Sequence, residues 1–172
     1  MQTRYLTTVD SPAGPLHIVV TEAGALTQIA FGAIKSSNAV AAHLHARGFD
    51  VSEDDTSAAN VIRQLAEYAA GTRHTFDLRL ERHGSAWEEQ VWTALCTIPY
   101  GETRSYGQIA ALLGDATKAR AVGWANNANP IPVVVPCHRV IGAQGNLTGF
   151  GGGIEAKIKL LAHEGALLPG FA

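Results

Sequence analysis

The stretch Ile131-Pro132-Val133-Val134-Val135-Pro136-Cys137-His138-Arg139-Val140 joins an apolar run to a cysteine and a histidine. Residues 131–135 are mostly β-branched and carry no charge, which predicts a short buried strand. Pro136 should end that strand, because proline has no N–H to donate to a ladder. Cys137 is therefore expected just past a strand end, with His138 beside it. A thiol is a strong nucleophile as the thiolate, and a neighbouring imidazole network can supply that form.

Further motifs flank this stretch at fixed places in the chain: Asn129-Pro130-Ile131-Pro132, Gly149-Phe150-Gly151-Gly152-Gly153 and Leu161-Ala162-His163-Glu164-Gly165. In this order and spacing, the set resembles the methylated-DNA–protein-cysteine methyltransferases. The resemblance runs from about Ser85 to Gly165. It is looser over the first 80 or so residues, where the family itself varies.

The resemblance implies a DNA-repair activity in which Cys137 itself accepts an alkyl group. A methyl or larger alkyl group would leave the 6-O position of guanine, or the 4-O position of thymine, and stay on the sulfur. The product is a thioether with no good leaving group, so each molecule should act once, with no cofactor. The expected partner is double-stranded DNA carrying alkylated guanine, whose target nucleotide must be flipped out of the duplex.

The resemblance also assigns roles around Cys137. His138 is the expected general base, acting through a water molecule because neighbours on an extended strand point to opposite faces. Glu164 would orient His138 and stabilise its imidazolium, and Asn129 is the expected hinge residue in the turn before the apolar run. Gly165 predicts that Glu164 lies in the last turn of a helix. A carboxylate there opposes the helix dipole, and a nearby cation would offset that cost.

Residues 85–172 are predicted to form a mainly α-helical domain. Two segments have the pattern of a capping box, which predicts a helix after each serine: Ser85-Ala86-Trp87-Glu88 and Ser105-Tyr106-Gly107-Gln108. The second helix should stop at Gly114, and a third is expected over residues 117–128. Two short helices joined by a glycine turn are typical of a helix-turn-helix.

The resemblance implies that this helix pair approaches the minor groove of DNA. Arg120 would fill the gap left by the flipped nucleotide, and the small residues Ala119 and Gly123 would allow close approach. Tyr106 would help to swing the nucleotide out and would donate a hydrogen bond to the leaving guanine. Trp124 stands where small residues are common, and the sequence leaves open whether it anchors the core or faces DNA.

The substrate pocket is expected to be walled by Val140 and by Phe150 and Gly151 of the glycine-rich loop. The family has an aromatic residue, usually tyrosine, at the first of these two loop positions and often a serine at the next. Phenylalanine keeps the stacking face, whereas glycine removes a hydroxyl donor. The pocket is therefore expected to be roomier and to admit alkyl groups larger than methyl.

Residues 1–84 are predicted to form an α/β domain, which the resemblance describes as ribonuclease-H-like, with an antiparallel sheet and a helix. Strands are expected over residues 5–9, 16–21, 26–31 and 76–80. Hydrophobic spacing predicts a helix near residues 61–69, and the polar segment 35–57 should hold a short helix and a loop. No metal site is expected, because His43 and His45 lack a third ligand and no cysteine precedes Cys96.

Composition limits the other possibilities. The 172 residues, 47% of them hydrophobic, suit a globular protein with one core plus a smaller domain. The sequence has no apolar run long enough to cross a membrane and no recognisable secretion signal, so a cytoplasmic monomer is expected. Cys96 is expected on the apolar side of a helix, with both thiols reduced. The net charge of −2 gives nucleic-acid binding no support, so that prediction depends on the motifs.

Three alternatives use the same residues differently. A protein that flips alkylated bases without repairing them would lack the nucleophile, whereas Cys137 is present. A cysteine hydrolase would use Cys137, His138 and Glu164 for acyl transfer, which leaves the helix-turn-helix unexplained. A transcription regulator would use the helix-turn-helix alone.

Overall fold

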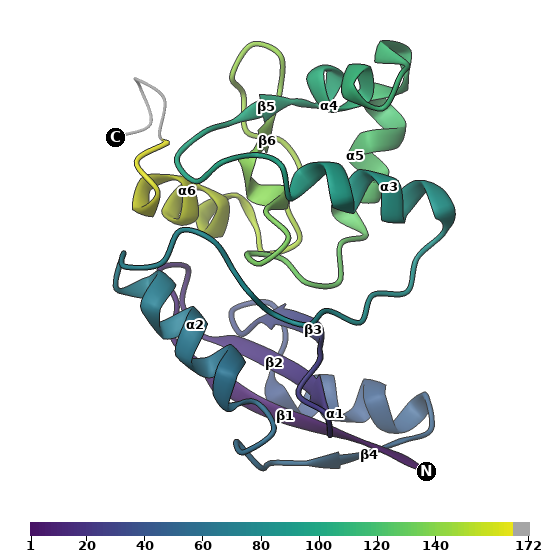
Figure 1. Cartoon of the computed structure of the whole chain (residues 1–172), viewed down its shortest axis with the longest axis vertical. Helices are drawn as coiled ribbons and strands as arrows, with labels where there is room; N and C mark the ends of the chain where they lie inside the picture. Colours follow the sequence, from purple (N-terminus) through teal and green to yellow (C-terminus); the bar gives the residue numbers. More distant parts are fainter. Residues whose placement is uncertain (167–172) are drawn as a thin grey trace. The chain divides into compact units, whose positions relative to one another are not determined.

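The computed structural model describes residues 1–166, which divide into two compact units, Met1–Arg82 and a second that begins at His83. The first unit is an α/β domain, a sheet with two helices, and the second unit is mainly helical (Figure 1). The division lies close to the boundary expected between residues 84 and 85. Within residues 1–166, every helix is too short or too polar to cross a membrane.

The sheet of the first unit has the strand order β3-β2-β1-β4. β1 (Gln2–Val9), β2 (Leu16–Thr21) and β3 (Leu26–Phe31) pair antiparallel as expected, because short turns connect them. β4 (Phe49–Ser52) was not expected and pairs parallel with β1, so the sheet is mixed rather than wholly antiparallel. The helix α1 (Ser37–Ala46) precedes β4 and carries the chain back across the sheet, as a parallel pairing requires.

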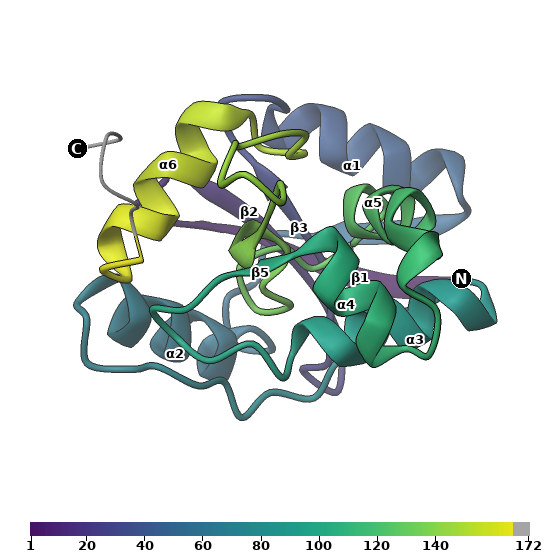
Figure 2. The same cartoon turned by 90° about the horizontal axis from the view of Figure 1, so that it is seen from above.

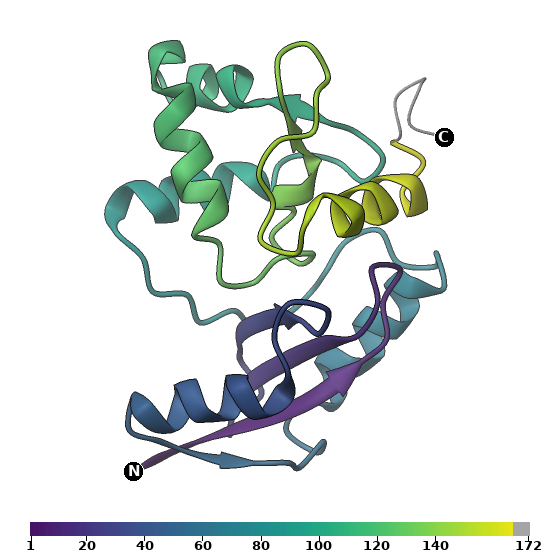
Figure 3. The ribbon, with the colours of Figure 1, turned by 180° about the vertical axis from the view of Figure 1, so that it is seen from behind.

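Helices α1 and α2 (Ala59–Ala69) cover opposite faces of this sheet (Figures 2 and 3). Val40 and Leu44 of α1 join Leu6 and Val19 of the strands in one apolar cluster. The helix α2 confirms the helix expected near residues 61–69, and on its own side of the sheet it buries Val61, Leu65 and Tyr68. The strand β2 is buried at its first five positions because both faces of the sheet are covered.

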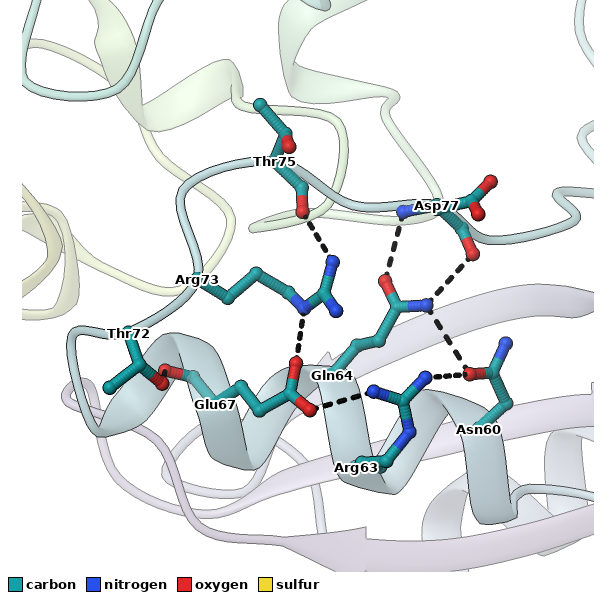
Figure 4. A network of polar contacts seen from close by, with 8 residues as sticks. All are labelled: Asn60, Arg63, Gln64, Glu67, Thr72, Arg73, Thr75 and Asp77. Atoms are coloured by element: carbon teal, nitrogen blue, oxygen red, sulfur yellow. Dashed lines mark hydrogen bonds and ion pairs between the residues drawn. The ribbon is translucent and has the colours of Figure 1, made fainter.

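The strand expected over residues 76–80 is not formed; a single bridge to β3 is all that remains of it. The backbone of Asp77 instead pairs with a side chain of α2 (Figure 4): Gln64 donates to its carbonyl over 2.8 Å and accepts from its N–H over 2.9 Å. Arg73 fixes the same segment through a 2.6 Å ion pair with Glu67. The Gln64 amide therefore takes the place of a neighbouring strand.

The second unit, over its described residues, has a two-stranded parallel sheet between its helices. Its elements are α3 (Ala86–Leu95), β5 (Arg104–Ser105), α4 (Tyr106–Leu112), the 3₁₀ helix η1 (Ala116–Lys118), α5 (Ala119–Asn127), the 3₁₀ helix η2 (Cys137–Arg139), β6 (Val140–Ile141) and α6 (Ile154–His163). Both predicted capping boxes are confirmed: Ser85 pairs with Glu88 at the start of α3, and Ser105 with Gln108 at the start of α4.

Two indoles of α3 hydrogen-bond to the backbone of α5. Trp87 Nε1 donates to the Ala121 carbonyl over 3.1 Å, and Trp92 Nε1 donates to the Ala125 carbonyl over 2.8 Å. Trp92 is 2% exposed, so it is a core residue. The helix α5 is thus fastened to α3 along one side.

The apolar segment 131–135 is buried as expected, but it is a turn and not a strand. The Val135 N–H donates to the Ile131 carbonyl over 2.9 Å, which closes the turn, and Val133 has a φ of 75°. A positive φ is strained for a β-branched residue. Prolines at positions 130, 132 and 136 remove the donors that a ladder needs, so Cys137 opens η2 instead of following a strand.

Cys96 does not lie in the core. The helix α3 ends at Leu95, so the side chain at the next position leaves the apolar face, and Cys96 is exposed. Leu112, the last residue of α4, is also exposed. No disulfide joins Cys96 to Cys137.

Replacing Gln64 by methionine is expected to lower the free energy of unfolding by about 1–3 kcal/mol, because the N–H and C=O of Asp77 lose their partners. Urea unfolding measures this loss. Arg63→Ala, one position away, is the control and should cost less than about 1 kcal/mol, because its ion pair with Glu67 is exposed. Equal losses in the two variants would contradict the role of Gln64.

Candidate active site

Cys137 is buried, with 3% of its surface exposed, at the start of η2. Its N–H donates to the Val135 carbonyl over 2.8 Å, and its carbonyl accepts from Asn126 Nδ2 over 3.3 Å. Asn126 is a buried residue of α5, so the backbone at the cysteine is fixed from both sides. The sulfur is therefore held in one place, although it follows a turn.

His138 is fully buried, and its Nε2 lies 2.8 Å from Glu164 Oε1. The carboxylate can only accept, so Nε2 carries the proton of the neutral imidazole and Nδ1 keeps its lone pair. Nδ1 has no hydrogen-bond partner among the described protein atoms. Glu164 directly follows the last residue of α6, in the final turn as predicted. The hydrogen bond to Glu164 thus leaves Nδ1 of His138, the residue that follows Cys137, unprotonated.

The cation expected near Glu164 is Arg139. Its Nε donates to Oε2 over 2.8 Å and its Nη2 to Oε1 over 3.0 Å, which is a bidentate contact. The third donor, Nη1, binds the Ile98 carbonyl over 2.6 Å. Arg139 was assigned no role from the sequence, although it stands directly after His138. The guanidinium compensates both the burial of the carboxylate and its place at a helix C-terminus.

Burial alone would raise the pKa of Glu164, but hydrogen bonds and charge from His138 and Arg139 together hold that pKa well below its usual range. Burial lowers the pKa of His138, and the hydrogen bond to Glu164 only partly opposes this. At neutral pH the site therefore holds an ionised carboxylate and a neutral imidazole, the form that accepts a proton.

Burial raises the pKa of Cys137 to about 11, although a hydrogen bond from Asn129 and the charge of Lys157 pull it down. The resting sulfur is therefore a protonated thiol. The thiolate must be made during the reaction, when a base removes the proton.

Lys157 is a buried residue that was not predicted to belong to the site. Its Nζ donates to the Val140 carbonyl over 2.5 Å and to the Thr148 carbonyl over 3.3 Å. Burial lowers its pKa to about 8, and the nearby Cys137 opposes the shift. The sequence did contain an indication that Lys157 is buried. Position 157 lies three residues after Ile154 and four before Leu161, which places it on the apolar side of α6. A lysine there needs a partner in the core.

Asn129 makes the contacts expected of a turn residue. Its Nδ2 donates to the Val135 carbonyl over 2.9 Å, and its Oδ1 accepts from the Ile131 N–H over 3.0 Å. The same side chain that closes the strained turn also pulls the pKa of Cys137 down.

Tyr106 lies at the start of α4 and reaches the glycine-rich loop. Its hydroxyl donates to the Thr148 carbonyl over 3.1 Å, and its ring lies 3.8 Å from where a Cβ at Gly123 would stand. Burial raises its pKa, and so does Cys137. The phenol therefore stays protonated near the sulfur and can serve as a donor.

The remaining predicted residues have different positions. Val140 is buried in β6 and Phe150 is half-buried. Gly151 is exposed, and no atom lies within 4 Å of where its Cβ would stand. On α5, Arg120 is exposed and Ala119 half-buried, and neither takes part in the contacts described above. No group of three metal-ligating side chains occurs among residues 1–166.

A buried cysteine, a neutral imidazole and an ionised carboxylate are the groups that thiol-based nucleophilic chemistry requires. Residues 86–166 match the family model described as 6-O-methylguanine DNA methyltransferase, DNA binding domain, and residues 4–82 match that of its ribonuclease-like domain. The chain belongs to this family, the methylated-DNA–protein-cysteine methyltransferases.

Similar proteins carry the same name. The chain is 55% identical over 112 residues to the methylated-DNA–protein-cysteine methyltransferase of Mycolicibacterium paratuberculosis, covering 65% of this chain and 68% of that protein. The enzyme of Methanosarcina barkeri is 41% identical over 160 residues, 93% of this chain and 96% of its own. The crystal structure of Mycobacterium tuberculosis OGT in complex with DNA is similar with a TM-score of 0.80 and 41% identity, covering 98% and 96% of the two chains.

Replacing Lys157 by methionine is expected to disfavour the thiolate of Cys137 below about pH 8, because the lysine is still charged there and that charge is lost. The rate at which iodoacetamide modifies Cys137, followed by peptide mass spectrometry against pH, should then be lower than in the wild type over that range. Lys159→Met is the matched control, since Lys159 is half-exposed and paired with Glu155. An unshifted profile in a folded Lys157→Met protein would show that this charge does not act on the sulfur.

Proposed function

We propose that this protein repairs DNA by moving an alkyl group from the 6-O position of guanine to Cys137, once per molecule. The observation that carries the proposal is the chain of contacts from Arg139 through Glu164 to His138, next to a buried thiol, in the part of the chain that matches the family's DNA-binding domain. The same chemistry extends to the 4-O position of thymine, which also holds an alkyl group on an exocyclic oxygen.

The transfer exchanges a proton for an alkyl group. Nδ1 of His138 takes the thiol proton, directly or through one water molecule, and Glu164 stabilises the imidazolium. The sulfur of Cys137 forms a bond to the alkyl carbon while the bond from that carbon to the guanine oxygen breaks. The bonding pair goes to guanine, whose anion then takes up a proton. The Tyr106 hydroxyl donates a hydrogen bond to this guanine after giving up its bond to the Thr148 carbonyl.

The reaction leaves a thioether on Cys137. A thioether has no good leaving group, so the sulfur is not regenerated and each molecule acts once. The chemistry requires no cofactor, because the only groups that move are the alkyl group and a proton. We propose that the protein acts as a monomer in the cytoplasm.

The target base must leave the duplex before the sulfur can reach it. We propose that α4 and α5 act as a helix-turn-helix in the minor groove and that Arg120 fills the gap in the stack. The exposed position of Arg120 and the close packing of Tyr106 on Gly123 support this arrangement. Ala119 would let the same helix approach the sugars closely.

Mixing the protein with a duplex that carries one 6-O-methylguanine is expected to add one methyl group to Cys137 and no more, at one equivalent per protein. Intact-mass and peptide mass spectrometry measure the adduct, and Cys137→Ser is the control that should bind the duplex without reacting. Sustained turnover would favour a hydrolase, and tight binding with no adduct would favour a binding protein. Either result would contradict the proposal.

Gly151 allows a test of the pocket. Because open space surrounds a Cβ built at this position, Gly151→Ser should fold normally and return a hydroxyl to the loop. We expect the wild type to transfer benzyl and methyl groups from 6-O-alkylguanine in DNA at comparable rates, and the serine variant to lose benzyl transfer selectively. Rapid-quench rates on the two substrates measure this, and a strong preference of the wild type for methyl would rule out the roomy pocket.

A further inference from the structure

Trp124 of α5 takes no part in the transfer chemistry. Its side chain is 71% exposed, and it is the one aromatic among the large apolar residues found exposed in residues 1–166. The other two tryptophans of the chain, Trp87 and Trp92, are hydrogen-bonded to the backbone of α5. A single exposed apolar side chain needs no explanation by itself, so its neighbours on the helix matter.

Trp124 belongs to one exposed side of α5. Arg120, Trp124 and Asn127 follow one another at spacings of four and three, which places them on the same side of a helix, and all three are exposed. The opposite side is buried through Val122 and Ala125. The indole therefore shares its surface with a cation and an amide.

The C-terminal end of this surface reaches the loop that walls the pocket. Oδ1 of Asn127 lies 3.9 Å from where a Cβ at Gly149 would stand. One turn earlier, Gly123 lies against the Tyr106 ring, whose hydroxyl is bonded to the residue before Gly149. Along α5, Trp124 thus lies between Arg120 and the residue that approaches the glycine-rich loop, Asn127.

We infer that Trp124 contacts DNA, with its indole packed against a sugar or base edge in the minor groove beside the flipped nucleotide. The inference rests on the proposed function. Four residues of α-helix rise about 6 Å, less than two base-pair steps, so Arg120 and Trp124 reach neighbouring nucleotides. An indole adds affinity without neutralising phosphates, which suits a chain whose net charge is −2.

Binding to an alkylated duplex tests the contact, with the Cys137→Ser background preventing reaction. Trp124→Ala is expected to weaken binding about tenfold, and Trp124→Phe to weaken it much less, because a phenyl ring retains the stacking face. The slope of log affinity against log salt should stay unchanged in both variants, since no phosphate contact is lost. Ile34→Ala is the control, as it removes a 59% exposed apolar side chain from the other unit.

Tryptophan emission gives a second readout. Duplex addition should change the emission of the wild type, and Trp124→Phe should abolish most of that change, because Trp87 and Trp92 are already engaged within the protein. Wild-type duplex affinity in Trp124→Ala, or an emission change that survives in Trp124→Phe, would overturn the inference. If Trp124 instead covered a second protein chain, its loss would alter the sedimentation of the protein while duplex affinity stayed constant, which would also overturn it.

Free 6-O-benzylguanine separates this inference from the function on which it rests. Transfer of the benzyl group from the free base to Cys137 needs no duplex, so the wild type and Trp124→Ala should react at the same rate. A wild type that transfers no alkyl group from either the free base or the duplex would count against the proposed function. A Trp124→Ala protein that is slow on the free base would show damage to the site and overturn the assignment of Trp124 to DNA.

Discussion

The buried ion pair between Arg139 and Glu164 holds the second unit together around its cysteine. The guanidinium bonds both carboxylate oxygens and the Ile98 carbonyl, so three separate segments meet at one side chain. Burying two charges is costly, and such a pair is tolerated only when the remaining donors and acceptors are satisfied. In this site, Oε1 of Glu164 also accepts a hydrogen bond from Nε2 of His138. The same contacts that stabilise the end of α6 therefore also set the tautomer of the histidine.

Burial gives this site a sulfur and an imidazole that are both neutral at rest. It raises the pKa of Cys137 and lowers that of His138, and the neighbouring charges do not reverse either shift. A thiol is a far weaker nucleophile than a thiolate. Electrophiles in solution that do not trigger proton transfer from the sulfur therefore meet a weakly reactive thiol.

Local sequence patterns predicted the elements whose stability is local. The capping boxes at Ser85 and Ser105, the strands β1 to β3 and the helix near residues 61–69 depend on neighbours within a few residues, and all were found. The turn at residues 131–135 and the segment near Asp77 depend instead on the side chains of Asn129 and Gln64, whose contacts override β propensity.

The same limit applies to the site. The sequence motifs predicted Cys137, His138 and Glu164 as site residues, because their order and spacing resemble those of a known family. The roles of Arg139 and Lys157 follow from partners far away in the chain, and no local pattern distinguishes a buried charge from an exposed one. Position 157 carried the clearer signal, a lysine on the apolar side of a helix.

The two indole hydrogen bonds from α3 give α5 a fixed support. Trp87 and Trp92 fasten carbonyls one turn apart, so the helix is held in position and rotation before any DNA arrives. In the binding mode proposed above, association does not have to order α5, so the conformational entropy that a mobile helix would lose on binding is not lost. That mode lets a chain with little long-range attraction for a polyanion bind DNA through a surface whose shape is complete in advance.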